Sequence, residues 1–106
     1  MPATLAFAMY RPKKGKEKEL KKLLKNHFPL MRRLGLITEN SAHRVESENG
    51  TIIEIFEWKN AAAKKKAHSH PDMLAIWGPM MELCDFPSMK ELPEAKSSFP
   101  NFKVIR

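Results

Sequence analysis

The dipeptide Asn49-Gly50 constrains the fold more than any other feature of this sequence. It separates Ala42–Glu48 from Thr51–Trp58, and the second of these segments reads TIIEIFEW. Asn-Gly tolerates the positive φ angles of a type I′ turn, and the β-branched and aromatic residues that follow indicate a strand. The sequence therefore predicts an antiparallel hairpin closed by a two-residue turn.

The register of this hairpin decides which side chains share a face of the sheet. The predicted turn pairs Arg44 with Ile55 and Glu46 with Ile53, which places both isoleucines on one face. The other face then carries Val45, Ile52, Phe56 and Trp58. Both faces are apolar enough to need cover. Helices can cover one of them, and a second copy of the sheet is the natural candidate for the other.

The segments before the hairpin have the spacing of a strand and a helix. Thr4–Tyr10 is a short apolar run and indicates a strand. A helix is predicted downstream of Gly15, because its apolar residues recur at intervals of three and four and its lysines occupy the opposite face. Pro29 is expected to bend this helix and Gly35 to cap its end. The apolar stripe consists of Leu20, Leu23, Leu24, His27, Phe28, Met31 and Leu34.

Two further helices and a last strand complete the predicted order. Asn60 can cap a short helix over Ala61–His68, and Pro71 suits the first turn of the next helix. The tail ends in the strand-like run FKVI, and residues 1–106 are expected to form a single domain. A β-α-β-β-α-β order is the ferredoxin-like plan. We therefore expect an α+β fold with an antiparallel sheet, helices on one face and a homodimer that packs face to face over the other.

Three segments of the chain resemble a known family. They are the strand end IFEWKN (Ile55–Asn60), the alanine-rich helix that leads to AHSHP (Ala67–Pro71), and the helix MLAIWGPMM (Met73–Met81). On these segments, most of the chain resembles the antibiotic biosynthesis monooxygenase-like (ABM) proteins of the dimeric α+β barrel superfamily. The resemblance implies a small homodimer with a pocket between the sheet and the helices of each subunit. Some members are cofactor-free monooxygenases of aromatic polyketides or quinols, some degrade haem, and many have no assigned activity.

The haem-degrading branch of that family can be compared residue by residue. It is known for an asparagine on the first strand, a tryptophan on the short helix and a histidine on the next helix. The corresponding positions here are Ala8, Ala67 and Trp77. Because an indole ring cannot ligate iron, we expect no haem degradation, and we expect no cofactor.

The run His68-x-His70-x-Asp72 raises the question of a metal site. Zinc accepts imidazole and carboxylate ligands, but residues two apart do not share a helix face, so this run converges only in a loop. In the alternative, Asp72 lies in the first turn of a helix, where the helix dipole favours an acid, and the residues before it form a linker. We favour the alternative and predict no metal site.

Acid–base chemistry and ligand binding have separate candidates. A neutral histidine near a substrate can take up a proton at physiological pH, and His70 and His43 are the candidates for that role. The predicted pocket lining is Phe56, Trp58, His68, Met73, Trp77 and Met81, although an apolar stripe of this kind also fits a core or a dimer interface. Two functions stay open. The first is binding, with cofactor-free oxidation, of a small aromatic or quinol-type molecule. The second is a non-catalytic homodimeric binding or stress-related protein.

The net charge of +7 raises the question of an anionic partner. Many of the lysines lie on the outer face of the first predicted helix, mixed with Glu17 and Glu19, so a solvated face is favoured over a nucleic-acid site. No apolar run approaches the roughly 20 residues of a membrane span, and we expect no secretory signal in the first residues. The single cysteine, Cys84, fits a reducing cytoplasm, which is the expected location. The role of residues 87–106 stays open.

Overall fold

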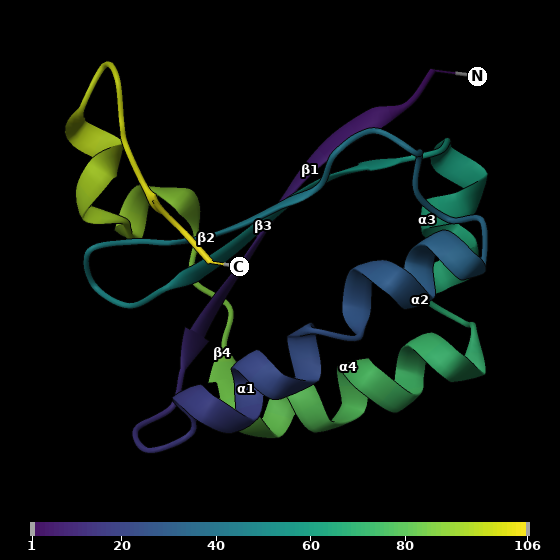
Figure 1. Cartoon of the computed structure of the whole chain (residues 1–106), viewed down its shortest axis with the longest axis horizontal. Helices are drawn as coiled ribbons and strands as arrows, with labels where there is room; N and C mark the ends of the chain where they lie inside the picture. The colour runs from purple at the N-terminus through teal and green to yellow at the C-terminus, as the bar shows by residue number, and fades with distance from the viewer. Residues whose placement is uncertain (1, 106) are drawn as a thin grey trace.

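The computed structural model describes residues 2–105 and has an α+β fold (Figure 1). Its antiparallel strands form a five-stranded sheet in the order β4-β1-β3-β2-β5, and α1 to α4 lie against one face of it. The order β4-β1-β3-β2 is compatible with the expected ferredoxin-like plan, to which β5 adds a strand at one edge. The elements are β1 (Thr4–Pro12), α1 (Glu17–Leu24), α2 (His27–Arg33), β2 (His43–Glu46), β3 (Ile52–Trp58), α3 (Ala61–Ala67), α4 (Pro71–Leu83), β4 (Cys84–Asp85), the 3₁₀ helices Met89–Glu91 and Pro93–Lys96, and β5 (Lys103–Val104).

The β2–β3 hairpin turns through three residues instead of two. Val45 pairs with Ile53, one position away from the predicted register, so residues 48–50 form the loop. Gly50 has a φ of +89°, whereas no non-glycine residue among 2–105 has a positive φ, so Asn49 does not take the type I′ conformation. The loop instead fits a type I turn followed by a left-handed glycine. The predicted two-residue turn and its register were wrong.

This difference of one residue exchanges the two faces of β2. Side chains alternate along a strand, so a shift of one residue moves each side chain to the opposite face. Val45 therefore lies with Ile53 and Ile55 on what we call the second face of the sheet, and Arg44 comes opposite Glu54 on the helix-covered face. The helix-covered face carries Ala6, Ala8, Tyr10, Ile52, Glu54, Phe56 and Trp58.

The predicted first helix is divided into two. α1 ends at Leu24 and α2 begins at His27, so that Pro29 stands in the first turn of α2, where its missing N–H breaks no helical hydrogen bond. The apolar stripe is confirmed as the buried side of both helices, and Leu24 and Met31 are fully buried. Gly35, with a φ of +70°, follows α2 as the predicted left-handed cap.

The starts of α3 and α4 agree with the sequence. The Asn60 side chain accepts a hydrogen bond from the Ala63 N–H at 2.8 Å, and Pro71 is the first residue of α4. Pro79 lies inside α4 without ending it. Among residues 2–105, no helix has the length and apolarity that crossing a membrane requires.

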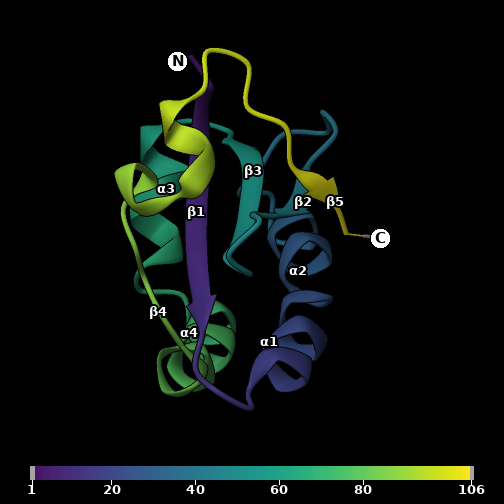
Figure 2. The same cartoon turned by 90° about the vertical axis from the view of Figure 1, so that its left-hand side faces the viewer.

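The C-terminal segment, residues 87–105, covers part of the second face. It runs from β4 at one edge of the sheet to β5 at the other (Figure 2). Leu92 and Phe102 of this segment pack against Val45 and Ile53. A second copy of the sheet was the expected cover of this face, but the chain's own C-terminal segment covers part of it. Part of the face still lacks cover, because Phe7 on β1 remains 45% exposed.

Gly50→Ala is expected to lower the free energy of unfolding by about 1 kcal/mol, because a left-handed conformation is sterically unfavourable for a residue with a Cβ. Gly78→Ala is the control, because Gly78 lies inside α4 and, beyond the adjacent residues, a new Cβ has no neighbour within 4 Å at either position. The control should change the free energy of unfolding by less, because the higher helix propensity of alanine is opposed by contact of its Cβ with the ring of Pro79. Urea denaturation measures both, and equal stability of Gly50→Ala and the wild type would contradict this loop.

Candidate functional site

A buried carboxylate lies in the middle of β3, on the helix-covered face. Glu54 is 0% exposed, and three side chains donate hydrogen bonds to it. The Tyr10 hydroxyl on β1 lies 2.9 Å from Oε1, and His27 Nδ1 on α2 lies 2.7 Å from the same oxygen. On β2, Arg44 reaches Oε2 with Nε at 3.1 Å and Nη2 at 2.8 Å. The carboxylate thus has donors from two strands and a helix.

The surroundings keep Glu54 ionised. Burial raises the pKa of its carboxyl. The hydrogen bond from His27 and the charge and hydrogen bonds of Arg44 lower this pKa by more than burial raises it, so it lies below its ordinary value. Burial and the neighbouring Glu54 charge raise the pKa of Tyr10 well above its ordinary value, so this phenol stays a donor. Arg44 also donates to the Leu24 carbonyl at the end of α1, at 2.6 Å.

The second nitrogen of His27 determines the state of the ring. The Trp77 indole N–H on α4 donates to His27 Nε2 at 3.0 Å. Indole is a donor only, so Nε2 must accept and carries no proton. The remaining ring proton is therefore on Nδ1, where it is donated to Glu54. His27 is neutral, and its two partners select one tautomer and one ring orientation.

This network borders an open cavity of about 420 Å³ between the sheet, α3 and α4, which we call the helix-side cavity. Its apolar wall combines aromatic side chains with alanine, methionine and proline, and the polar side chains that line it are Tyr10, His27, Lys64 and His68. His68 packs against Trp77 with 5.3 Å between ring centroids. The aromatic residues of the wall include Phe56, Trp58, Trp77 and Phe86.

Four of the six residues predicted to line a pocket border this cavity, namely Phe56, Trp58, His68 and Trp77. The other two do not. Met73 is fully buried on the core side of α4, and Met81 is 65% exposed on the outer side of the same helix.

The two histidines predicted for acid–base chemistry lie outside the cavity. His70 precedes α4, where its Nδ1 accepts a hydrogen bond from the Asp72 N–H at 3.1 Å. His43 is exposed at the start of β2, opposite Ile55. Neither side chain meets the other or the Glu54 network.

The two histidines of the candidate metal run, His68 and His70, each make a local hydrogen bond. His68 Nδ1 donates to the Lys64 carbonyl at 2.8 Å, and His70 caps α4. Within the described part of the chain, residues 2–105, no three His, Cys, Asp or Glu side chains are grouped so that they could hold a metal ion. Cys84 is buried as well, and burial raises the pKa of its thiol to about 11.

Sequence reasoning missed the central residues of the site. His27 was expected in the apolar stripe, which is its correct position, but its partners lie 27 and 50 residues away along the chain. One local signal was available. Glu54 interrupts the run IIEIF, and a charged residue in an otherwise apolar buried strand needs a partner of opposite charge.

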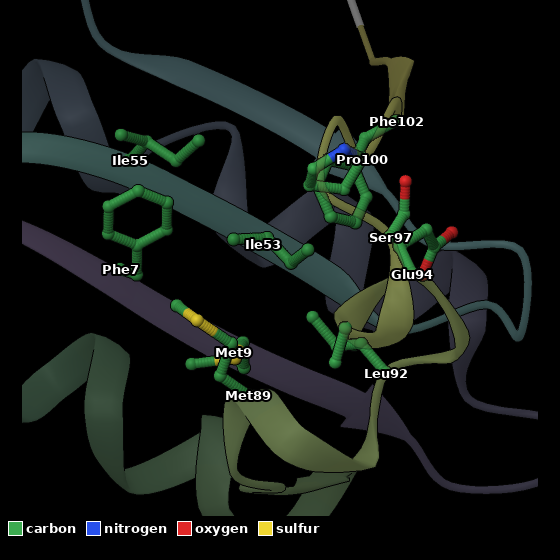
Figure 3. Close-up of a pocket in the computed structure, with 11 residues that line it drawn as sticks. Phe7, Met9, Ile53, Ile55, Met89, Leu92, Glu94, Ser97, Pro100 and Phe102 are labelled. Carbon is green, nitrogen blue, oxygen red and sulfur yellow. The ribbon is translucent and has the colours of Figure 1, made fainter.

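A second cavity, of about 320 Å³, lies between the second face of the sheet and the C-terminal segment. Figure 3 shows Phe7, Met9 and Ile53 on the strands facing Met89 and Leu92 on the segment. Its lining is almost wholly apolar, and the one ionisable side chain among the lining residues is Glu94, which is held by the Ser47 hydroxyl at 2.7 Å.

Comparison of the chain with protein-family models, with curated proteins and with solved structures finds no match. What the site can do is therefore derived from its own geometry.

Glu54→Gln is expected to lower the free energy of unfolding by about 3 kcal/mol or more, because Arg44 would stay buried without its counter-charge. Glu19→Gln is the matched control, since Glu19 forms an exposed pair with Lys16 at 3.4 Å. Glu19→Gln should lower the free energy of unfolding far less than Glu54→Gln does. Guanidinium denaturation at neutral pH compares the two, and similar losses would contradict a structural role for the buried pair.

The stability difference between wild type and Glu54→Gln should also depend on pH. The pKa of Glu54 is lower in the folded than in the unfolded protein, so its contribution is full above the unfolded value, near about 4.3. The contribution is lost as the pH falls through the folded pKa. The difference should therefore narrow in acid, as measured by denaturation at a series of pH values. A constant difference would contradict an ionised Glu54.

Proposed function

We propose that this protein binds a small planar aromatic molecule in the helix-side cavity. The observation that carries the proposal is the cavity of about 420 Å³ whose wall combines Phe56, Trp58 and Trp77 with an oriented histidine, His27. Small-molecule sites are typically concave and mostly apolar, with a few fixed polar groups. Aromatic walls favour a flat ring by offset stacking and edge contacts.

We further propose that the chain is an ABM-like protein of the dimeric α+β barrel type and acts as a homodimer. The antiparallel sheet with helices on one face supports this assignment. Leu5 and Phe7 on β1, which are 56% and 45% exposed, offer apolar surface on the second face beside the C-terminal segment. The single cysteine, Cys84, favours a reducing compartment such as the cytoplasm.

A second candidate function is cofactor-free oxygenation of a quinol-type ligand in the same cavity. It is favoured by the neutral His27, whose Nε2 is an acceptor at the cavity wall. With anthrone as the substrate, the ring methylene loses a proton to a base, and the carbanion passes one electron to O2. The radical and superoxide then form a C–O bond, and the peroxide anion takes the proton back from the base. The resulting hydroperoxide loses water to leave a carbonyl. One oxygen atom enters the product and the other leaves as water.

Isothermal titration calorimetry with anthrone tests the binding proposal. The wild type is expected to bind, and Ala6→Phe should weaken binding at least about tenfold, because Ala6 lines the cavity and a phenyl ring would occupy the ligand's place. Met81→Ala is the control, because Met81 is 65% exposed outside the cavity, and it should bind as the wild type does. Failure of the wild type to bind any planar aromatic probe would contradict the proposal.

Oxygen uptake separates the two functions. If the protein is an oxygenase, anthrone should consume O2 in equal molar amount, faster than without protein, and Ala6→Phe should abolish the acceleration. Binding without accelerated uptake would favour a non-catalytic binding protein.

A further inference from the structure

We infer that His27 Nε2 is the acceptor for a hydroxyl group on the bound ring, and that the Trp77 indole N–H holds this position while the site is empty. The inference rests on the proposed aromatic ligand and defines its class: a phenol, naphthol or other hydroxylated ring. It gives His27, rather than His70 or His43, the proton-accepting role.

The neighbours of His27 determine which of its two ring nitrogens is the acceptor. Glu54 accepts a hydrogen bond from the Nδ1–H at 2.7 Å, and two further donors from Arg44 and one from Tyr10 hold that carboxylate in place. The ring therefore cannot rotate or change tautomer without leaving a buried carboxylate short of a donor. His27 itself is only 2% exposed, and the lone pair on Nε2 is its remaining hydrogen-bonding position.

Trp77 is suited to be displaced from this position. It lies on α4, on the opposite wall of the cavity from the sheet, and its side chain is only partly buried. Its indole has a second neighbour, the exposed ring of His68, and both rings line the cavity. A ligand hydroxyl that takes Nε2 replaces one donor with another, so the buried histidine keeps its hydrogen bond.

The exchange also explains how the site would select its ligand. A hydrocarbon ring that displaced the indole would leave Nε2 buried without a donor, which is costly, whereas a hydroxylated ring would not. For a sufficiently acidic hydroxyl the exchange can continue as proton transfer, in which the O–H bond breaks and an Nε2–H bond forms. The resulting imidazolium would lie between the new oxyanion and Glu54, both of which stabilise its charge.

Equilibrium dialysis with 2-naphthol and naphthalene tests the inference, since these ligands differ by one hydroxyl. The wild type should bind 2-naphthol at least about fivefold more tightly, the ratio for one net hydrogen bond. His27→Asn keeps an N–H near the position of Nδ1 for Glu54 but has no acceptor in place of Nε2. Its ratio should fall to about one, with the naphthalene affinity unchanged within about twofold. An unchanged ratio in this variant overturns the assignment of His27.

Trp77→Phe tests the exchange itself. It removes the competing donor while keeping an aromatic ring, so the preference for 2-naphthol should rise above that of the wild type. A lower preference would mean that the indole contacts the ligand hydroxyl directly. It would overturn the inference that the Trp77 N–H occupies the place of that hydroxyl in the empty site.

Nuclear magnetic resonance of the wild type gives a readout that does not depend on any variant folding. The Trp77 indole N–H resonance should move upfield with 2-naphthol as its hydrogen bond to His27 is lost, and much less with naphthalene. Trp58, which lines the same cavity without bonding His27, is the internal control. Equal shifts with both ligands would overturn the inference. If the wild type bound both ligands equally well, only the His27 assignment would fail, whereas binding of neither would contradict the proposed function as well.

Discussion

Much of this structure depends on one buried carboxylate that has no access to water. The ionised Glu54 is tolerable inside the fold only because β1, β2 and α2 each supply a donor to it. Arg44 continues the network to the end of α1, and Trp77 continues it to α4, so the sheet and three helices meet at one polar point. A slipped β2 would turn Arg44 away from Glu54, and the pair therefore opposes the register that the Asn-Gly turn would otherwise permit.

The two faces of the sheet differ in kind. The helix-covered face combines apolar packing with the Glu54 network, whereas the second face borders an almost wholly apolar cavity and receives the C-terminal segment. On the helix side, the neutral His27 offers an acceptor at the cavity wall, whereas the Glu94 carboxylate at the second cavity accepts from Ser47 and from the Glu48 N–H. The second face offers surface for packing, first to residues 87–105 and then, in the proposed homodimer, to another copy.

His27 provides a donor that the buried Glu54 needs, but that role uses only Nδ1. In the proposed ligand complex, the free lone pair of Nε2 accepts the hydroxyl of the bound ring. Trp77 gives this nitrogen a partner in the empty protein, which removes the cost of an unpaired acceptor. The same ring is also part of the wall that a ligand would meet.

The sequence by itself determined the features that depend on neighbours along the chain: the apolar stripe that became α1 and α2, the caps at Asn60 and Gly35, and the strand that follows Asn49-Gly50. These could be predicted because periodicity and capping act within a few residues. The hairpin register was missed by one residue, since Asn-Gly is compatible with a two- or a three-residue loop. Only the tertiary structure decided the register and the site, because His27, Glu54 and Trp77 belong to α2, β3 and α4, and only the packing of those helices on the sheet makes them neighbours.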